Sequence, residues 1–148
     1  MFTSEDQQKF RALRITHVAA TFEALIRDEN NDNLTPEQLF LTAVDDALAV
    51  RRANRIERLI KQANFPIPYA SIAELDYRDG RGISPTRMRR YGLLDWRQET
   101  TNLLISSPTG GGKTYLACAI GIAACEREHE VRYHRMDDLA RDLTIARN

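Results

Sequence analysis

The residues best suited to chemistry in this chain lie in one segment, SPTGGGKT. Its members are Ser107, Pro108, Thr109, Gly110, Gly111, Gly112, Lys113 and Thr114. Three consecutive glycines let a backbone wrap an anion with no side chain in the way. A lysine supplies a mobile charge for the β and γ phosphates, and the following threonine hydroxyl is placed to ligate Mg²⁺. The segment therefore predicts a site for nucleotide phosphates, with ATP and Mg²⁺ as the expected ligands.

One position of the segment departs from the phosphate-loop pattern GxxxxGK[ST]. Ser107 stands where the pattern has its first glycine. If the backbone there needs a positive φ, serine adopts it at a cost of about 1 kcal/mol or somewhat more. The plain alternative is a glycine-rich turn that binds nothing, and Gly-Gly-Gly-Lys-Thr would be a costly choice for a mere turn. We therefore expect residues 107–114 to bind phosphate, with an affinity that Ser107 lowers.

The elements around the segment must hold it between a strand and a helix if it is to work as a phosphate loop. Leu103 to Ile105 form a short apolar run, as is typical of a buried parallel strand. Residues 113–126 have helical apolar spacing, and Val131 to Arg135 are typical of a second strand. Strand, loop, helix and strand make a βαβ unit. The expected fold class is therefore α/β, with a helical N-terminal domain before the first βαβ part of a P-loop core.

Helices are expected in most of the chain before residue 100. Apolar periodicity predicts a first helix over residues 5–27, and Thr35-Pro36 begins a second that has no glycine or proline until Pro66. Three prolines and two glycines mark residues 65–85 as a linker, and helical spacing returns over 87–99. The expected domains are 1–64 for partner or DNA binding, 65–86 as linker, and 87–148 as a partial P-loop ATPase domain.

Charge is balanced overall but uneven along the chain. The 21 basic and 21 acidic side chains give a formal net charge of zero, so no overall field draws the molecule to nucleic acid or membrane. A basic stripe nevertheless follows the acidic N-terminal part, and it consists of Arg51, Arg55, Arg58 and Lys61. The stripe predicts contact with DNA phosphates or an acidic partner, and its alternative is a solvated helix face.

Cysteine usage and hydropathy set the expected compartment. Cys118 and Cys125 form no CxxC pair, which argues against a disulfide framework and a zinc site. The N-terminus lacks the apolar core of a signal peptide, and the longest mostly apolar run, Leu116 to Cys125, is about half a membrane span. We expect a cytoplasmic protein with no membrane partner and with both cysteines in the core.

Several segments together resemble the IstB-like helper ATPases of bacterial insertion sequences, which are related to the DnaC helicase loaders of the AAA+ class. The resemblance covers nearly the whole chain. The segments that carry it are NRIERLIKQANFP (54–66), LDYRDGRGIS (75–84), LDW (94–96), NLLISSPTGGGKTYLACAIGIAAC (102–125) and VRYHRMDDL (131–139).

The resemblance implies an N-terminal helical domain that engages a transposase or DNA, and a C-terminal AAA+ core that assembles on DNA with ATP bound. Lys113 and Thr114 then correspond to the Walker A lysine and the threonine linked to magnesium. The stretch from Leu75 to Tyr77 is implied to border the adenine. A homo-oligomer is left open.

A further departure concerns catalysis. The 148 residues stop before the strand where this family places the Walker B acidic pair. Without a carboxylate to hold magnesium and orient water, we expect these residues alone to hydrolyse ATP poorly, if at all. A fragment, a disrupted reading frame and a split product fit equally well. The alternatives to a transposition helper are a DnaC-like helicase loader and a non-catalytic interaction module.

Overall fold

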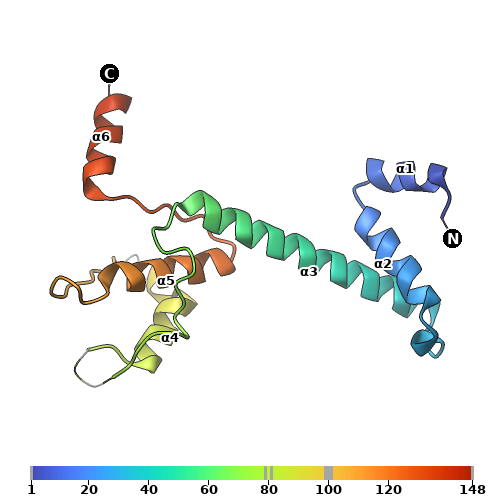
Figure 1. Cartoon of the computed structure of the whole chain (residues 1–148), viewed down its shortest axis with the longest axis horizontal. Coiled ribbons are helices and arrows are strands. Elements are labelled where there is room, and N and C mark those ends of the chain that lie inside the picture. Colours follow the sequence, from blue (N-terminus) through green and yellow to red (C-terminus); the bar gives the residue numbers. More distant parts are fainter. Residues whose placement is uncertain (1, 79, 81, 99–101, 148) are drawn as a thin grey trace. The chain divides into compact units, whose positions relative to one another are not determined.

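The computed structural model describes residues 2–78, 80, 82–98 and 102–147, and all of its regular elements in these ranges are helical (Figure 1). In chain order the elements are α1 (Ser4–Ala12), α2 (Thr16–Arg27), η1 (Glu29–Asn31), α3 (Pro36–Ala63), α4 (Pro85–Leu93), η2 (Asp95–Arg97), α5 (Lys113–Glu126) and α6 (Met136–Ala146). They form two compact units, residues 1–54 and 55–148, and α3 contributes to both.

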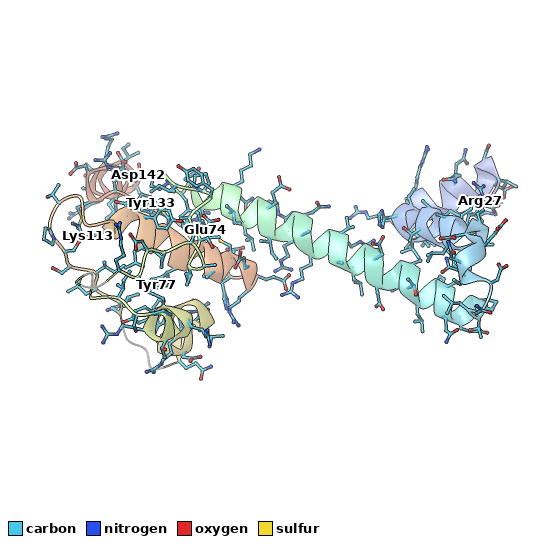
Figure 2. The ribbon with its side chains drawn as sticks, turned by 60° about the horizontal axis from the view of Figure 1, so that its bottom comes forward. Arg27, Glu74, Tyr77, Lys113, Tyr133 and Asp142 are labelled. Atoms are coloured by element: carbon cyan, nitrogen blue, oxygen red, sulfur yellow. The ribbon has the colours of Figure 1, made fainter. Side chains whose placement is uncertain are left out.

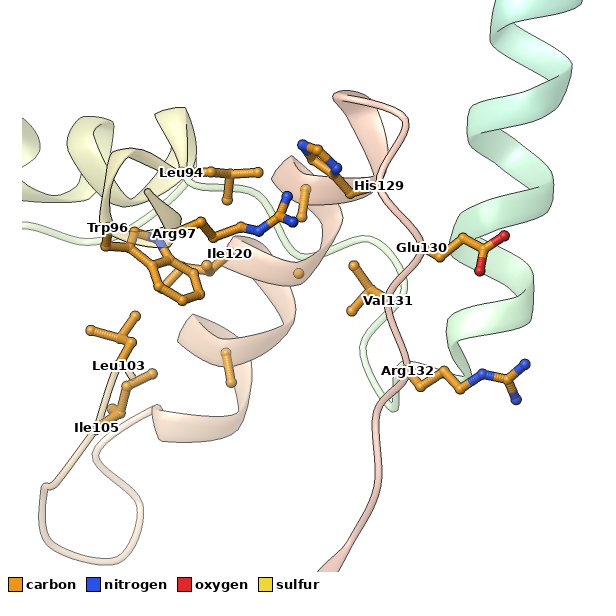
Figure 3. A pocket seen from close by; sticks show the side chains of 13 residues that line it. Leu94, Trp96, Arg97, Leu103, Ile105, Ile120, His129, Glu130, Val131 and Arg132 are labelled. Atoms are coloured by element: carbon orange, nitrogen blue, oxygen red, sulfur yellow. The ribbon is translucent and has the colours of Figure 1, made fainter. Parts of the chain in front are cut away.

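The expected α/β fold is wrong for this chain, because the described residues contain no strand. The two segments predicted as strands, around 103–105 and 131–135, have no ladder hydrogen bonds to each other. They border opposite sides of a hollow over α5, with Leu103 and Ile105 on one side and Val131 on the other (Figure 3). The Tyr133 amide instead donates to the Ala63 carbonyl at the end of α3, at 2.9 Å. A short apolar run forms a strand only where a neighbouring strand pairs with its backbone N–H and C=O groups. Here neither of the two segments pairs with the other.

The first unit is built from α1, α2 and the beginning of α3. The single helix predicted over residues 5–27 is divided in two, because Arg14 adopts a left-handed conformation (φ 57°) between α1 and α2. The Arg51 guanidinium donates a hydrogen bond to the Arg14 carbonyl, which satisfies a backbone group that the break leaves free. The predicted helix is thus interrupted at a position that has neither glycine nor proline, and a residue distant in the sequence contacts the break.

Helix α2 packs against α3 through small and aromatic side chains. The buried residues of these two helices in the first unit are Ala19, Leu39, Ala43 and Ala47. Phe22 meets Phe40 edge to face, with ring centroids 5.8 Å apart, and His17 Nε2 lies 2.7 Å from Asp46 Oδ2. Thr35 caps α3 as predicted, since its hydroxyl accepts from the Gln38 amide and the Gln38 side chain accepts from the Thr35 amide.

The second unit has its core between the end of α3, the segment that follows it, and α5. The core residues are Leu59, Ala63, Phe65, Ala70, Cys118, Ala119, Ile122 and Cys125. Helix α5 begins at Lys113 and ends at Glu126, as the sequence predicts, and α4 packs against it. Arg127 Nε donates to the Gly92 carbonyl at 3.0 Å and so supplies a partner near the end of α4. The residues between α3 and α4 therefore lie partly inside the core.

Both cysteines are core residues, as expected. Each side chain is fully buried, and burial raises the pKa of both thiols. Because the thiolate is the reactive form, we predict that they react with a disulfide reagent at least about 100-fold more slowly in the folded chain than in urea. The release of the coloured thiol product with time measures this ratio. Immediate reaction of both thiols in the folded chain would contradict the described core.

Candidate functional site: a glycine-rich loop beside a cavity

Residues 107–112 make a tight loop that leads directly into α5. The Gly111 amide donates to the Pro108 carbonyl at 3.0 Å, which closes the turn. Gly110 and Gly112 have φ values of 80° and 83°, in the left-handed region that other residues rarely adopt. Glycine is therefore required at both positions by the backbone alone.

Gly111 is required for a different reason. A Cβ atom built on it would lie 2.5 Å from Ser107 Oγ and 3.0 Å from the Pro108 carbonyl oxygen. The two ends of the loop therefore approach each other more closely than a side chain at this position would permit. Together the three glycines thus allow residues 107–112 to form one compact, exposed loop.

The N-terminus of α5 faces the loop with free donors. Gly112 caps the helix without any side-chain hydrogen bond, and the first helical amide bond to it comes from Leu116, at 3.0 Å. The first amides of a helix have no partner within the helix and carry its positive dipole end. This end of α5 can therefore receive an anion.

Lys113 places its ammonium group inside the loop. Its Nζ donates to the carbonyl oxygens of Ser107 at 2.7 Å and Pro108 at 2.9 Å, and it lies 3.5 Å from Ser107 Oγ. Figure 2 labels Lys113 at the start of α5. The loop therefore holds its positive charge in place before any ligand arrives. An ammonium with three donors can keep such contacts while it shares a hydrogen with a phosphate oxygen.

Ser107 is accommodated without the strain that the sequence led us to expect. It is not among the residues with positive φ, so serine has no left-handed conformation to adopt there. Its hydroxyl donates to the Pro108 carbonyl at 3.3 Å. The missing first glycine therefore costs the described loop no backbone strain.

Thr114 is exposed, and its hydroxyl has no hydrogen-bond partner within the described ranges. It remains available to a ligand or a hydrated cation. No group of three or more His, Cys, Asp or Glu side chains that could hold a metal is found among these residues. A cation at this loop would therefore be held by the threonine hydroxyl, water and the phosphates of a nucleotide.

A cavity of about 740 Å³ adjoins the loop and is large enough for a small organic ligand. Its lining residues come from four parts of the second unit: residues 74–76, residues 80, 82–83, 87–88 and 91, the segment 103–108, and residues 111–113 and 115–116. Leu75, which the family resemblance placed near the adenine, lines this cavity. Tyr77 is not among the lining residues, and its hydroxyl donates to the Ile72 carbonyl at 3.0 Å.

The wall from α4 is the part of the site that the sequence did not predict. Arg87, Met88 and Tyr91 all line the cavity, and the Arg87 guanidinium has no hydrogen bond or ion pair in the part of the chain that the structure describes. Their spacing in the sequence indicates only that they lie on a helix. The packing of α4 on α5 is what brings them to the loop, and the sequence does not show that packing. A further contact holds the 74–76 wall, since the Ser71 amide donates to the Tyr115 hydroxyl at 3.2 Å.

The predicted basic stripe on α3 is only partly available to a partner. Arg51 donates to the Arg14 carbonyl, and Arg55 Nε lies 3.4 Å from Glu128 Oε1. Arg58 and Lys61 are exposed and have no ion pair within the described segments. Two of the four residues therefore remain free to bind phosphate.

Comparison with known proteins gives one family and several relatives. The family described as IstB-like ATP binding protein matches residues 8–148. The insertion sequence IS1162 putative ATP-binding protein of Pseudomonas fluorescens is 32% identical over 146 residues, which are 99% of this chain and 63% of the relative. The putative insertion sequence ATP-binding protein y4pL of Sinorhizobium fredii is 27% identical over 140 residues, which are 94% of this chain and 56% of the relative.

A third relative, the insertion sequence IS21 putative ATP-binding protein of Pseudomonas aeruginosa, is 25% identical over 135 residues. That match covers 91% of this chain and 51% of the relative. The chain thus spans between about half and two thirds of the length of these relatives. Among the described residues, none of the helices combines the length and the apolarity that a bilayer crossing requires.

Proposed function

Because the chain belongs to the family of IstB-like ATP binding proteins, we propose that it binds ATP at residues 107–114 and assists an insertion-sequence transposase. The loop geometry carries the first part of this proposal. A closed turn, the free amides of α5 and the ammonium of Lys113 all meet at one exposed point. Those are the donors that a polyphosphate needs.

The cation in this proposal is Mg²⁺, which the hydroxyl of Thr114 would help to hold and which would offset the negative charge of the phosphates. That hydroxyl has no hydrogen-bond partner among the described residues, and oxygen ligands suit Mg²⁺, which keeps several water molecules when it binds. The base and ribose occupy the adjoining cavity, where Leu75, Met88 and Tyr91 supply apolar walls. Removing Mg²⁺ with a chelator should therefore weaken ATP binding without unfolding the chain.

Calorimetry of the folded chain with MgATP tests the proposal. We expect saturable binding in the micromolar to low millimolar range, weaker binding of AMP, and no binding of adenosine alone at these concentrations, because most contacts are to phosphates. The control is the same titration with EDTA in place of Mg²⁺. An absence of saturation with MgATP at millimolar concentrations would leave the loop without its proposed ligand.

In this proposal, residues 1–64 bind the transposase or DNA, residues 65–86 form a connecting segment, and residues 87–148 bind the nucleotide. The names of the relatives refer to insertion sequences, which favours a transposition helper over a helicase loader. For DNA, Arg58 and Lys61 are the stripe residues whose charges are not already used within the chain.

Salt dependence distinguishes DNA contact through this stripe from a solvated helix face. Each phosphate contact contributes about −0.9 to the slope of log K against log salt for duplex DNA. Changing both Arg58 and Lys61 to alanine should make that slope shallower by about 1.8. Arg27→Ala is the matched control, since Arg27 already pairs with Glu23 at 2.7 Å. An unchanged slope in the double variant would remove the stripe from the DNA-binding surface.

A further inference from the structure

Two cationic side chains, Lys113 and Arg87, line the described part of the cavity beside the loop. Lys113 Nζ is held by the carbonyls of Ser107 and Pro108, and the proposed ATP site uses its charge for the terminal phosphates. The Arg87 guanidinium, in contrast, has no hydrogen bond or ion pair among the described residues. A guanidinium has five N–H donors, so all five are open to a ligand of the cavity.

The position of Arg87 on α4 is unfavourable for a cation unless an anion is close by. Ser84 caps α4 by accepting a hydrogen bond from the Arg87 amide at 3.3 Å, which places Arg87 in the first turn of the helix. A positive side chain there is repelled by the positive end of the helix dipole. The first turn of α4 has no acidic side chain to compensate it. An anionic ligand in the cavity would offset both positive charges.

The charges around the cavity indicate that a polyphosphate needs a second cation there. The charged residues of the described lining are Glu74, Asp76, Arg87 and Lys113. Asp76 Oδ2 accepts a hydrogen bond from Arg78 Nε at 2.7 Å, so a neighbouring cation compensates this carboxylate. The carboxylate of Glu74 offsets the charge of Lys113. Arg87 is therefore the residue that gives the described lining a net positive charge, which attracts a polyanion.

The packing of α4 on α5 determines which part of a nucleotide Arg87 can reach. A Cβ built on Gly92, near the end of α4, would lie 3.9 Å from Ala123 Cβ, so these two positions are level. Along α5, Lys113 is ten residues before Ala123, which is about 15 Å. Along α4, Arg87 is only five residues before Gly92, which is about 7.5 Å. Whatever the crossing angle, the Arg87 backbone is therefore roughly 7 Å or more behind Lys113 along α5.

This offset matches the part of the nucleotide between its base and its terminal phosphates. Arg87 directly precedes Met88 and lies one helical turn before Tyr91, and these two residues are the proposed walls for the base. Tyr91 is next to Gly92, at the end of α4 that meets Ala123, whereas Arg87 is at the other end. In ATP, the α-phosphate is the anionic group that joins the nucleoside to the terminal phosphates. It is therefore the phosphate that Arg87 is best placed to contact.

We propose that Arg87 binds the α-phosphate of the nucleotide and is the second cation of the site. This inference rests on the proposed binding of ATP at residues 107–114. A guanidinium can donate two parallel N–H bonds to the oxygens of one phosphate, which makes arginine well suited to this role. ATP and ADP both contain an α-phosphate. Arg87 therefore contributes equally to the binding of both nucleotides.

Calorimetry of Arg87→Ala with MgATP and with MgADP tests this inference. We expect both dissociation constants to rise by about 10-fold, because an exposed charge-assisted contact is lost. Arg87→Lys should raise them by less than about 3-fold, because an ammonium also binds phosphate as a point charge. Arg89→Ala is the matched control, since Arg89 is an exposed arginine of the same helix that does not line the cavity. It should leave both constants unchanged.

The possible contrary results are distinct from one another. A loss of affinity for MgATP alone would place Arg87 at the γ-phosphate, and a loss that Arg87→Lys does not repair would place the guanidinium on the face of the base. An equal loss in Arg89→Ala would show a general effect of the charge on α4. Each of these results would overturn the assignment to the α-phosphate.

The original chain separates a failure of this inference from a failure of the proposed function. If the original chain binds MgATP and Arg87→Ala binds it equally well, the role of Arg87 is wrong and the proposed ATP site stands. If the original chain does not bind MgATP at millimolar concentrations, both are wrong. The Arg87 side chain is exposed, so its replacement should leave the fold intact, and circular dichroism of each variant measures this.

Discussion

Replacing Lys113 by alanine lowers the affinity for MgATP by about 100-fold in the proposed site. The ammonium is the one side-chain charge that the loop itself encloses, held by the carbonyls of Ser107 and Pro108. A charge-assisted hydrogen bond contributes about 1.5–3 kcal/mol, and tenfold in affinity corresponds to about 1.4 kcal/mol. Loss of the ammonium therefore removes about 2–3 kcal/mol of binding free energy. Calorimetry or displacement of a fluorescent ATP analogue measures this change.

The expected loss is specific to the ligand and leaves the fold intact. Residues 107–112 are exposed, so water replaces Lys113 at the two carbonyls and the chain's free energy of unfolding changes little. Lys61→Ala is the control, because it removes an equivalent charge from α3 at a position outside the cavity lining. If the Lys113 variant bound MgATP as tightly as the original chain, the proposal that this loop binds the phosphates would be wrong.

The sequence predicted the loop and its helix because the residues there determine their own backbone. Gly110 and Gly112 need a conformation that few other residues adopt, and Lys113 begins the apolar periodicity of α5. Thr35 and Gln38 likewise make the start of α3 visible through a local capping box. Where the physical cause lies within a few residues, sequence and structure agree.

The sequence failed where partners remote in the chain decide the outcome. Residues 103–105 and 131–135 have the composition of strands, but no described segment completes a ladder with either. The break at Arg14 has no local signal, and its carbonyl is bound by Arg51, 37 residues away in the chain. The α4 wall of the cavity depends on packing against α5, which periodicity does not reveal.

Phe65→Ala is the substitution with the largest expected effect on stability, about 3–5 kcal/mol. Phe65 is 8% exposed in the core, and its ring lies directly on the backbone of α5 at Gly121. A Cβ at Gly121 would approach Phe65 Cε1 to 2.6 Å, so the ring occupies the space next to this glycine, and its removal leaves a cavity there. Urea unfolding followed by Trp96 fluorescence measures the second unit, in which both residues lie.

Tyr69→Ala is the matched aromatic control, because Tyr69 is 78% exposed and its loss should change the free energy of unfolding by less than about 0.5 kcal/mol. Phe65 does not line the cavity beside the loop, whereas Lys113 does. In conditions where the Phe65 variant is still folded, it should therefore bind MgATP as the original chain does. A stable Phe65 variant would contradict the described core, while weak binding by its folded form would extend the site to residues that position α5.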